Sequence, residues 1–272
     1  MVVRQRGQPM IVNFAAVAGA SVAALLVVHT ITFAIGHRIG RYNVVDVAWG
    51  LGFIAVAAVA AVLGTGDPTR RWLLLLALAA IWGLRLSGYI YRRTAGQGED
   101  PRYADLLRDA TIGQILGQGV RAAGRRHLVH LAAAATLRGR RATPRRWLAA
   151  TLAGVLVWLT GVVFEALGDH QMGVFKSAPS HRGVVMDRGL WGWTRHPNYF
   201  GDACVWWGLW LITINRWWSL ATALSPSLMT YFLVCATGAR LTEKSMKGRP
   251  GFSEYEQRTS FFIPRRPRSA RR

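Results

Sequence analysis

Three kinds of residue are scarce in this sequence: lysine, acidic residues and cysteine. Of 34 basic residues only three are lysine, and they are set against 13 acidic residues, which gives a formal net charge of +21. The arginines lie beside long apolar runs, so cytoplasmic-side charge and anionic lipid headgroups explain them, and we expect no nucleic-acid partner. Cys204 and Cys235 both lie in apolar stretches without a partner nearby in sequence, so neither a disulfide framework nor a metal site is supported.

The common soluble nucleotide-binding and hydrolase motifs are also missing. The sequence has no Gly-rich strand-to-helix loop, no Walker motif, no nucleophile elbow and no metal-ligand cluster. A dinucleotide would therefore have to be held by a helical scaffold and not by a Rossmann sheet.

Long apolar runs are abundant, since 51% of the 272 residues are hydrophobic. A membrane-spanning helix needs about 20 apolar residues. Runs near that length are predicted at residues 11–35, 44–63, 72–90, 147–167, 199–214 and 217–236. The sequence therefore predicts an all-α protein, a polytopic helical membrane bundle with about six to seven spans within residues 1–236.

Residues 108–146 do not fit this pattern. They contain nine arginines, and their longest apolar-leaning run has about 10 residues, too short to span a bilayer. The basic segments 92–102 and 176–195 are both expected on the cytoplasmic side, yet only one convincing span, 147–167, separates them. We expect either a frame-shifted or degenerate segment that ends near Thr143, or an amphipathic or re-entrant segment on the cytoplasmic surface.

One stretch carries most of the polar chemistry, a basic, aromatic loop that runs into an apolar helix: DRGLWGWTRHPNYFGDACVWWGLW. Pro197 predicts a helix start, because proline suits the first turn of a helix. Arg195 beside that N-terminus favours a phosphate or carboxylate at the membrane surface. Asn198 and Asp202 share a face, and a carboxylate within an apolar run normally faces a polar cavity. A juxtamembrane basic-aromatic belt is the alternative, but it leaves Asn198 and Asp202 unexplained.

This stretch resembles the steroid 5-alpha reductase family, most closely its uncharacterised bacterial relatives, in which a GLW-x-x-TRHPNY-x-G-[DE] run precedes a membrane helix. A related RHP-x-Y-x-G pattern occurs in isoprenylcysteine carboxyl methyltransferases. The first family uses NADPH and the second S-adenosylmethionine. The resemblance implies a nucleotide-cofactor loop of a membrane enzyme. It puts Arg195, His196, Asn198, Tyr199 and Asp202 at the cofactor.

Two earlier segments also resemble the reductase family. In WGLRLSGYIYRR, Arg85, Tyr89 and Arg92 are spaced to share one helix face. Tyr89 falls where the family has the tyrosine that donates a proton to the substrate carbonyl, although Gly88 stands where animal members have histidine. By the resemblance, Asp46 in NVVDVAWG would orient that donor. The alternatives are an interfacial tyrosine and a helix-start carboxylate.

The end of the predicted 147–167 span adds a third polar group. Glu165, Asp169 and Lys176 are spaced to lie on one helix face. They resemble an N/E-x-x-x-D-x-x-x-x-x-x-[RK] run that contacts the cofactor in the reductases. The alternative is a polar helix end with Lys176 facing water.

The C-terminal region turns polar after the last predicted span. A polar stripe at helical spacing is formed by Arg240, Glu243, Lys244 and Lys247. Tyr255 lies in RPGFSEYEQRTSFFIP, which resembles a C-terminal signature shared by both families. The resemblance implies that residues 237–264 form a cytoplasmic helix and turn that close over the cofactor, with Arg240, Lys244 and Tyr255 in contact with it. Residues 265–272 are predicted to be a disordered basic tail.

The leading interpretation is an integral-membrane, NADPH-dependent oxidoreductase that reduces a conjugated C=C bond in a lipophilic enone, steroid-like or lipid-like. We expect a monomer in the bacterial inner membrane, with a cytoplasmic C-terminus and with lipids and a lipophilic small molecule as partners. Two alternatives stay open. One is a membrane methyltransferase that uses S-adenosylmethionine on a lipid or prenylated group, and the other is a non-catalytic membrane or lipid-binding protein.

Overall fold

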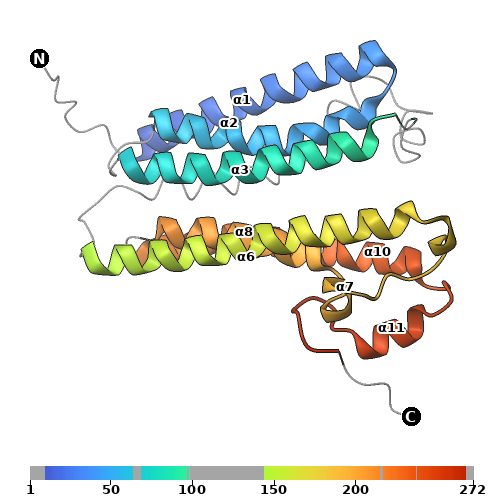
Figure 1. Cartoon of the computed structure of the whole chain (residues 1–272). Helices are drawn as coiled ribbons and strands as arrows, with labels where there is room; N and C mark the ends of the chain where they lie inside the picture. Colours follow the sequence, from blue (N-terminus) through green and yellow to red (C-terminus); the bar gives the residue numbers. More distant parts are fainter. Residues whose placement is uncertain are drawn as a thin grey trace, which may run out of the picture. The chain divides into compact units, whose positions relative to one another are not determined.

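The computed structural model describes residues 10–63, 69–96, 98, 144–214, 217–236 and 238–267, and within them all regular elements are helices (Figure 1). The prediction of an all-α fold is confirmed. Among the described residues, five helical stretches are long and apolar enough to cross a membrane: Ala15–Ile39, Tyr42–Leu63, Arg71–Thr94, Leu148–Ser177 and Leu220–Met246. They identify an integral membrane protein. A further apolar helix, α8 (Pro197–Thr213), has 17 residues and falls just short of that length.

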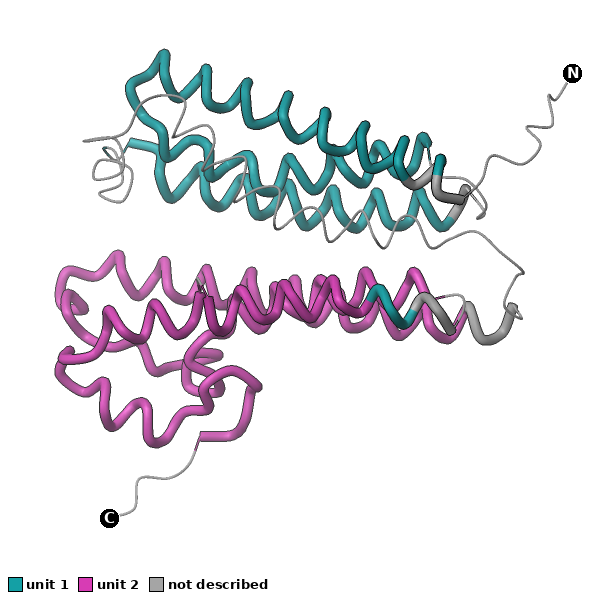
Figure 2. Tube along the Cα trace, turned by 180° about the vertical axis from the view of Figure 1, so that it is seen from behind, with its two compact units in different colours: residues 1–142, 215–222 teal, residues 143–214, 223–272 magenta. Residues whose placement is uncertain are grey.

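The chain divides into two compact units (Figure 2). Unit 1 consists of Met1–Ala142 with Asn215–Thr222, and unit 2 consists of Thr143–Ile214 with Ala223–Arg272. The domains predicted from the sequence separate membrane-embedded from cytoplasmic segments, whereas these two units are defined by contacts within the structure. The predicted domain boundaries therefore stay a prediction. The anomalous segment predicted at residues 108–146 lies outside the described residues as far as position 143.

The residues of unit 1 that the structure describes between positions 10 and 98 form three long helices and a short 3₁₀ helix. These are α1 (Met10–Ile39), η1 (Tyr42–Val47), α2 (Ala48–Leu63) and α3 (Thr69–Thr94). Helices α2 and α3 approach closely at Gly50 and Gly83, where a Cβ on Gly50 would overlap the Gly83 carbonyl oxygen. The Ser87 hydroxyl donates to the Val47 carbonyl oxygen at 2.7 Å. This hydrogen bond joins the last residue of η1, just before α2, to the second half of α3.

Unit 2 is built on a pair of long helices, α6 (Pro144–Ser177) and α8. The remaining elements are η2 (Pro179–His181), α7 (Leu190–Trp193), α9 (Leu224–Tyr231), the π-helical η4 (Phe232–Ala236), α10 (Ala239–Met246) and α11 (Phe252–Arg258). The 3₁₀ helix that precedes α9 in the chain, η3 (Trp217–Ala223), belongs to unit 1 except for Ala223. Helix α8 begins at Pro197, as predicted from the place of proline in a first turn.

Glycines set the register between α6 and α8. Gly154 and Gly161 are seven residues apart on α6 and lie against Gly208 and Gly201, also seven apart, on α8. A Cβ on Gly154 would stand 2.7 Å from the Gly208 oxygen, and one on Gly161 would stand 2.5 Å from the Gly201 oxygen. Small residues let membrane helices bring their backbones this close. This register fixes which side chains meet farther along the pair.

Helix α6 is longer than the span predicted from its apolar run. Its 34 residues correspond to about 51 Å, whereas the hydrocarbon core of a bilayer is about 30 Å thick. The apolar run ends near Leu167, and Gly168, Asp169 and His170 follow. The last turns of α6 therefore extend beyond the hydrocarbon core, and the polar residues of unit 2 gather there.

Candidate functional site

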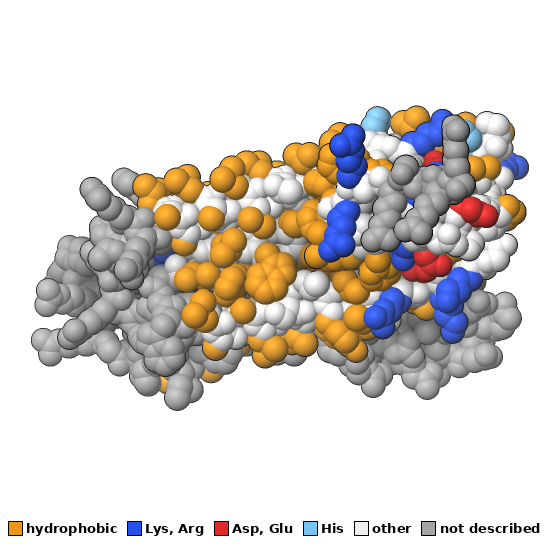
Figure 3. Space-filling view, turned by 90° about the horizontal axis from the view of Figure 1, so that it is seen from below, with side chains coloured by type: hydrophobic (Ala, Val, Ile, Leu, Met, Phe, Trp, Pro, Cys, Tyr) orange, Lys and Arg blue, Asp and Glu red, His pale blue; other side chains and the backbone are white. Residues whose placement is uncertain are grey.

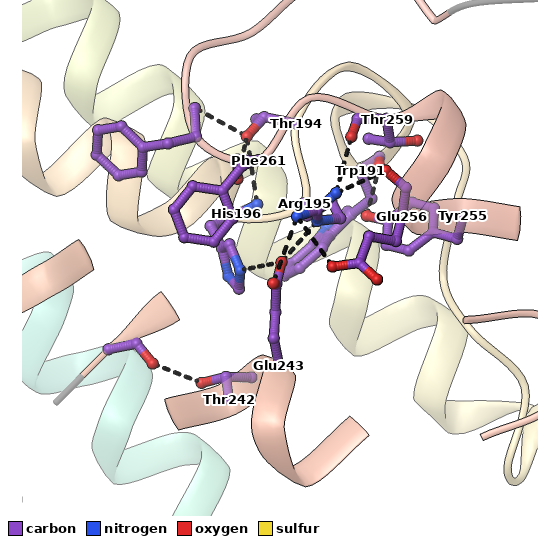
Figure 4. A network of polar contacts seen from close by, with 12 residues as sticks. Trp191, Thr194, Arg195, His196, Thr242, Glu243, Tyr255, Glu256, Thr259 and Phe261 are labelled. Atoms are coloured by element: carbon purple, nitrogen blue, oxygen red, sulfur yellow. Dashed lines mark hydrogen bonds and ion pairs between the residues drawn. The ribbon is translucent and has the colours of Figure 1, made fainter. Parts of the chain in front are cut away.

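An ion pair holds the N-terminus of α8 to the C-terminal part of unit 2 (Figure 4). The Arg195 Nε donates to Glu243 Oε1 at 2.6 Å and its Nη2 donates to Oε2 at 3.3 Å. Both residues are 8% exposed. Arg195 Nη1 also donates to the carbonyl oxygens of Glu256, at 2.7 Å, and Thr259, at 3.1 Å. The buried guanidinium is thus satisfied by groups from α10 and α11.

The same ion pair positions His196. Its Nε2 lies 3.1 Å from Glu243 Oε1. The imidazole stacks on Tyr199 at a centroid distance of 5.6 Å and meets Phe261 edge-on at 5.5 Å. The Arg195 guanidinium carbon lies 5.3 Å from the centre of the Phe261 ring. His196 and Tyr199, both predicted at the cofactor, therefore share one aromatic cluster around the α8 N-terminus.

The chain after α11, residues 259–265, forms a strap along the motif that precedes α8. The Arg195 N–H donates to the Ser260 carbonyl oxygen at 2.9 Å, and Thr194 pairs with Ser260 in an isolated parallel bridge. The Thr194 hydroxyl donates to the Phe262 carbonyl oxygen at 2.8 Å. The Arg265 N–H donates to the Trp193 carbonyl oxygen at 3.0 Å. The strap is thus fixed to the motif along its length.

Helices α7 and α11 connect this strap to α6. The Tyr255 hydroxyl donates to the Trp191 carbonyl oxygen at 2.7 Å, and burial raises the pKa of Tyr255 above its ordinary value near 10. The Trp191 Nε1–H donates to the Gly168 carbonyl oxygen at 3.0 Å. The Leu190 N–H donates to Gln171 Oε1 at 2.9 Å. We call α7, α10, α11 and the strap the C-terminal lobe.

The structure brings together two polar groups that lie far apart in sequence. A Cβ on Gly201 would stand 2.9 Å from the Glu165 side chain, so Glu165 lies against the second turn of α8, which also carries Asp202. A Cβ on Gly168 would stand 3.6 Å from the Asn198 backbone nitrogen. Glu165 is 4% exposed. The acidic residues predicted on α6 therefore lie at the level of the first two turns of α8, which carry Asn198 and Asp202.

Asp169 and Lys176 extend this face toward the end of α6. Asp169 is 8% exposed and lies beside Gly168, at the level of the first turn of α8. Lys176, nearly two turns later, is exposed. The Asn198 Oδ1 atom is buried and accepts no hydrogen bond from the residues that the structure describes. Asn198 thus has a buried amide oxygen to which no described residue donates, in the turn of α8 that lies at the level of Gly168.

Two exposed cations stand on α10, beside the residue that binds Arg195. Arg240 and Lys244 are one helical turn apart, and Glu243 lies between them in sequence. Because Glu243 is buried against Arg195, α10 is held at the α8 N-terminus. The positive charge that remains exposed there belongs to Arg240 and Lys244, which can meet an anion.

The residues predicted to be catalytic belong to unit 1. Asp46 lies in η1 and Tyr89 in α3, and both are half-buried. The Arg93 guanidinium carbon is 5.8 Å from the centre of the Tyr89 ring. The Ser87 bond to Val47, the residue after Asp46, fastens η1 to α3 two residues before Tyr89. The prediction that Asp46 orients Tyr89 stays a prediction.

Sequence reasoning missed the importance of Glu243. It placed Glu243 only in a polar stripe, while Arg195 was assigned to a phosphate. The signal that could have found the pair is physical: an arginine next to an apolar helix needs a compensating acid, because an unpaired buried charge is costly. Glu243 is the acidic residue of a short helix that otherwise carries basic charge.

Comparison with protein families gives one result. A model of a family described as "Protein of unknown function (DUF1295)" matches residues 32–259. This range contains η1, α2, α3 and α6, the motif before α8, and α10 and α11. Comparisons with curated proteins and with solved structures gave no significant match.

Proposed function

The chain belongs to this family, and from that premise we propose that it is an integral-membrane, NADPH-dependent reductase of a conjugated C=C bond in a lipophilic enone. This is the activity implied by the resemblance to the steroid 5-alpha reductases. The observation that carries the proposal is that buried Glu165 and Asp169, at the end of the apolar run of α6, lie at the level of the first two turns of α8, which carry Asn198 and Asp202.

The residues at the α8 N-terminus fit a dinucleotide. A buried acceptor left without a donor costs on the order of 1–3 kcal/mol, so a ligand N–H or O–H that reaches Asn198 Oδ1 would be favoured. Carboxylates such as Glu165 and Asp169 accept hydrogen bonds from ribose hydroxyls. Arg240 and Lys244 can bind phosphate oxygens. The resemblance also places Lys176, Asp202 and Tyr255 at the cofactor.

The proposal gives Arg195 and His196 a positioning role. The Arg195 guanidinium contacts Glu243, Glu256, Thr259 and the Phe261 ring. Arg195 therefore holds α10 and the strap at the place where Asn198 and the acidic residues stand. In this proposal the cations of α10 bind the phosphates.

Bound NADPH would supply a hydride, and Tyr89 and Asp46 would act on the substrate carbonyl. A phenol is protonated at neutral pH. Tyr89 would donate its hydrogen bond to the carbonyl oxygen and stabilise the negative charge that develops there. Asp46 would orient the hydroxyl. An enone that carries a large apolar body would reach such a site from the bilayer.

One observation keeps a second candidate open, a membrane methyltransferase that uses S-adenosylmethionine. The RHP-x-Y-x-G motif and the C-terminal signature both resemble those enzymes, and within unit 2 the motif is bonded to the C-terminal lobe, which contains the signature. That lobe is built without Asp46 or Tyr89. Its geometry therefore suits either cofactor.

Ligand-dependent melting of the purified protein separates these candidates. NADPH should raise the melting temperature, since a ligand that binds only the folded state stabilises it by mass action. Asn198→Ala should weaken NADPH binding about tenfold or more, because a hydrogen bond at a buried group contributes on the order of 1.5 kcal/mol. His170→Ala is the matched control, since His170 is exposed on α6.

The outcomes are distinct. A shift with S-adenosylmethionine and none with NADPH would replace the reductase by the methyltransferase. No shift with either ligand, from a protein that melts cooperatively, would favour a non-catalytic lipid-binding role. Equal NADPH affinity in the Asn198→Ala and His170→Ala variants would remove Asn198 from the site.

A further inference from the structure

The C-terminal lobe joins α6 at the place where the apolar part of that helix ends. The run of residues 148–167 is about 30 Å long at 1.5 Å per residue, which matches the hydrocarbon core. The lobe is bonded to the next residues of α6, through Trp191 to Gly168 and through Leu190 to Gln171. The lobe therefore begins at the level of the lipid headgroups.

Two large apolar side chains of the lobe are exposed. Trp193 is 50% exposed and Ile263 is 59% exposed. They belong to segments that are bonded together, because the Arg265 N–H donates to the Trp193 carbonyl oxygen at 3.0 Å. Arg265 and Arg266, which follow Ile263 after Pro264, are also exposed. We call Trp193, Ile263, Arg265 and Arg266 the anchor patch.

The surface around the lobe is strongly basic. From residue 176 to 267, ten described Lys or Arg side chains are exposed, against two acidic ones, Glu254 and Glu256. Figure 3 shows hydrophobic side chains along the helices and Lys and Arg gathered toward one end. An exposed tryptophan next to arginines is typical of membrane–water interfaces, and each basic residue near an anionic leaflet adds to its attraction.

We propose that the anchor patch docks the C-terminal lobe onto the headgroup region of an anionic bilayer. Trp193 and Ile263 would enter the interface, and Arg265 and Arg266 would contact lipid phosphates. Charge complementarity selects this occupant over another copy of the chain, since two such basic surfaces repel each other. The inference is independent of the proposed function, because it concerns only how the lobe meets lipid.

A fluorescent probe at position 263 tests this docking in the full chain. Cys204 and Cys235 are replaced by alanine, Ile263→Cys is labelled with an environment-sensitive dye, and the protein is reconstituted in nanodiscs. Discs of phosphatidylcholine are compared with discs that also contain phosphatidylglycerol, both with spin-labelled lipid as quencher. We expect quenching to be at least twofold stronger in the anionic discs and to weaken as salt is added.

Two charge-reversal pairs locate the effect. Arg265→Glu with Arg266→Glu should abolish the extra quenching, whereas Lys247→Glu with Arg249→Glu, the same change of charge in the turn after α10, should leave it in place. Arg265→Lys with Arg266→Lys should retain it. Helical circular dichroism and a single elution peak check that each variant is folded.

Three results would overturn the proposal. The first is equal quenching in neutral and anionic discs. The second is loss of quenching in both charge-reversal pairs, which would mean general electrostatic attraction without a local anchor. The third is a buried probe whose signal depends on protein concentration and not on lipid, which would mean that a second copy covers the patch.

Discussion

Removing the Glu243 carboxylate should release the C-terminal lobe. Arg195 and Glu243 are each 8% exposed and share two hydrogen bonds, at 2.6 and 3.3 Å. Glu243→Ala leaves the buried guanidinium with the more distant and exposed Glu256 carboxylate, 3.7 Å from Nη2, as its counter-charge, so we expect a cost at the lower end of the range of about 3–5 kcal/mol for a broken buried pair. Glu243→Gln keeps one acceptor for Nε but loses the charge, so about 1.5–3 kcal/mol is expected.

The paired variant Arg195→Met with Glu243→Leu tests the reasoning itself. It removes both charges, so no uncompensated ion remains, and such replacements are often neutral or stabilising. The bonds from Arg195 to the carbonyls of Glu256 and Thr259 are also lost, which costs about 2 kcal/mol at roughly 1 kcal/mol each. The paired variant should therefore be more stable than Glu243→Ala alone.

Hydrogen exchange of α11 and the strap is the suitable assay, because a lobe held by one buried network opens locally. A loss of about 3 kcal/mol corresponds to at least a hundredfold faster exchange, since every 1.4 kcal/mol is tenfold. Glu254→Ala is the matched control, an exposed carboxylate in the first turn of α11. Equal exchange in the Glu243→Ala and Glu254→Ala variants would refute the reasoning.

Three further predictions follow from particular contacts. Gly161→Ala places a Cβ 2.5 Å from the oxygen of a glycine on α8, so the free energy of unfolding measured with denaturant should fall by about 1–3 kcal/mol. Gly173→Ala in the same helix is the control, because its Cβ would meet nothing within 4 Å and should not lower the free energy of unfolding. Burial raises the pKa of Tyr255, so its protonated hydroxyl stabilises the fold below about pH 10 and this contribution is lost as pH rises further. The melting temperature of the wild type should then fall more between about pH 8 and pH 11 than that of Tyr255→Phe; parallel profiles would contradict this. Tyr89→Phe should lower enone reduction by about a hundredfold while NADPH still binds, and near-normal turnover would reassign the role.

Much of the helical architecture is predictable because a bilayer imposes it. Apolar runs of about 20 residues can satisfy their backbone only as helices, and Pro197 marks the start of α8. The apolar span was predicted to end near Leu167, and helix α6 continues beyond it to Ser177. The extension is held by tertiary contacts, with Gln171 bonded to Leu190 and Glu165 packed against Gly201. A single hydropathy profile contains no information on such contacts.

The sequence contained a pattern from which the position of Glu165 and Asp169 relative to the first turns of α8 could have been predicted. Gly154 and Gly161 on one helix and Gly201 and Gly208 on the other share a seven-residue spacing, and this spacing fixes which turns lie opposite each other. The sequence contains no comparably strong pattern that predicts the pairing of Glu243 with Arg195. It depends on how α10 returns after α9 and η4, and many loop geometries would satisfy the same composition.

The contacts of residues 194–198 explain why this motif alone does not identify the cofactor. Thr194, Arg195 and His196 all bind protein groups, and these contacts build the C-terminal lobe against α8. Asn198, the second residue of α8, instead keeps a buried oxygen to which no described residue donates. Because its first residues hold the C-terminal lobe against α8, the same motif can occur in proteins that have such a lobe but bind different ligands. The choice between NADPH and S-adenosylmethionine should then depend on Asn198 and the carboxylates near it, which makes substitutions there more informative than substitutions at Arg195.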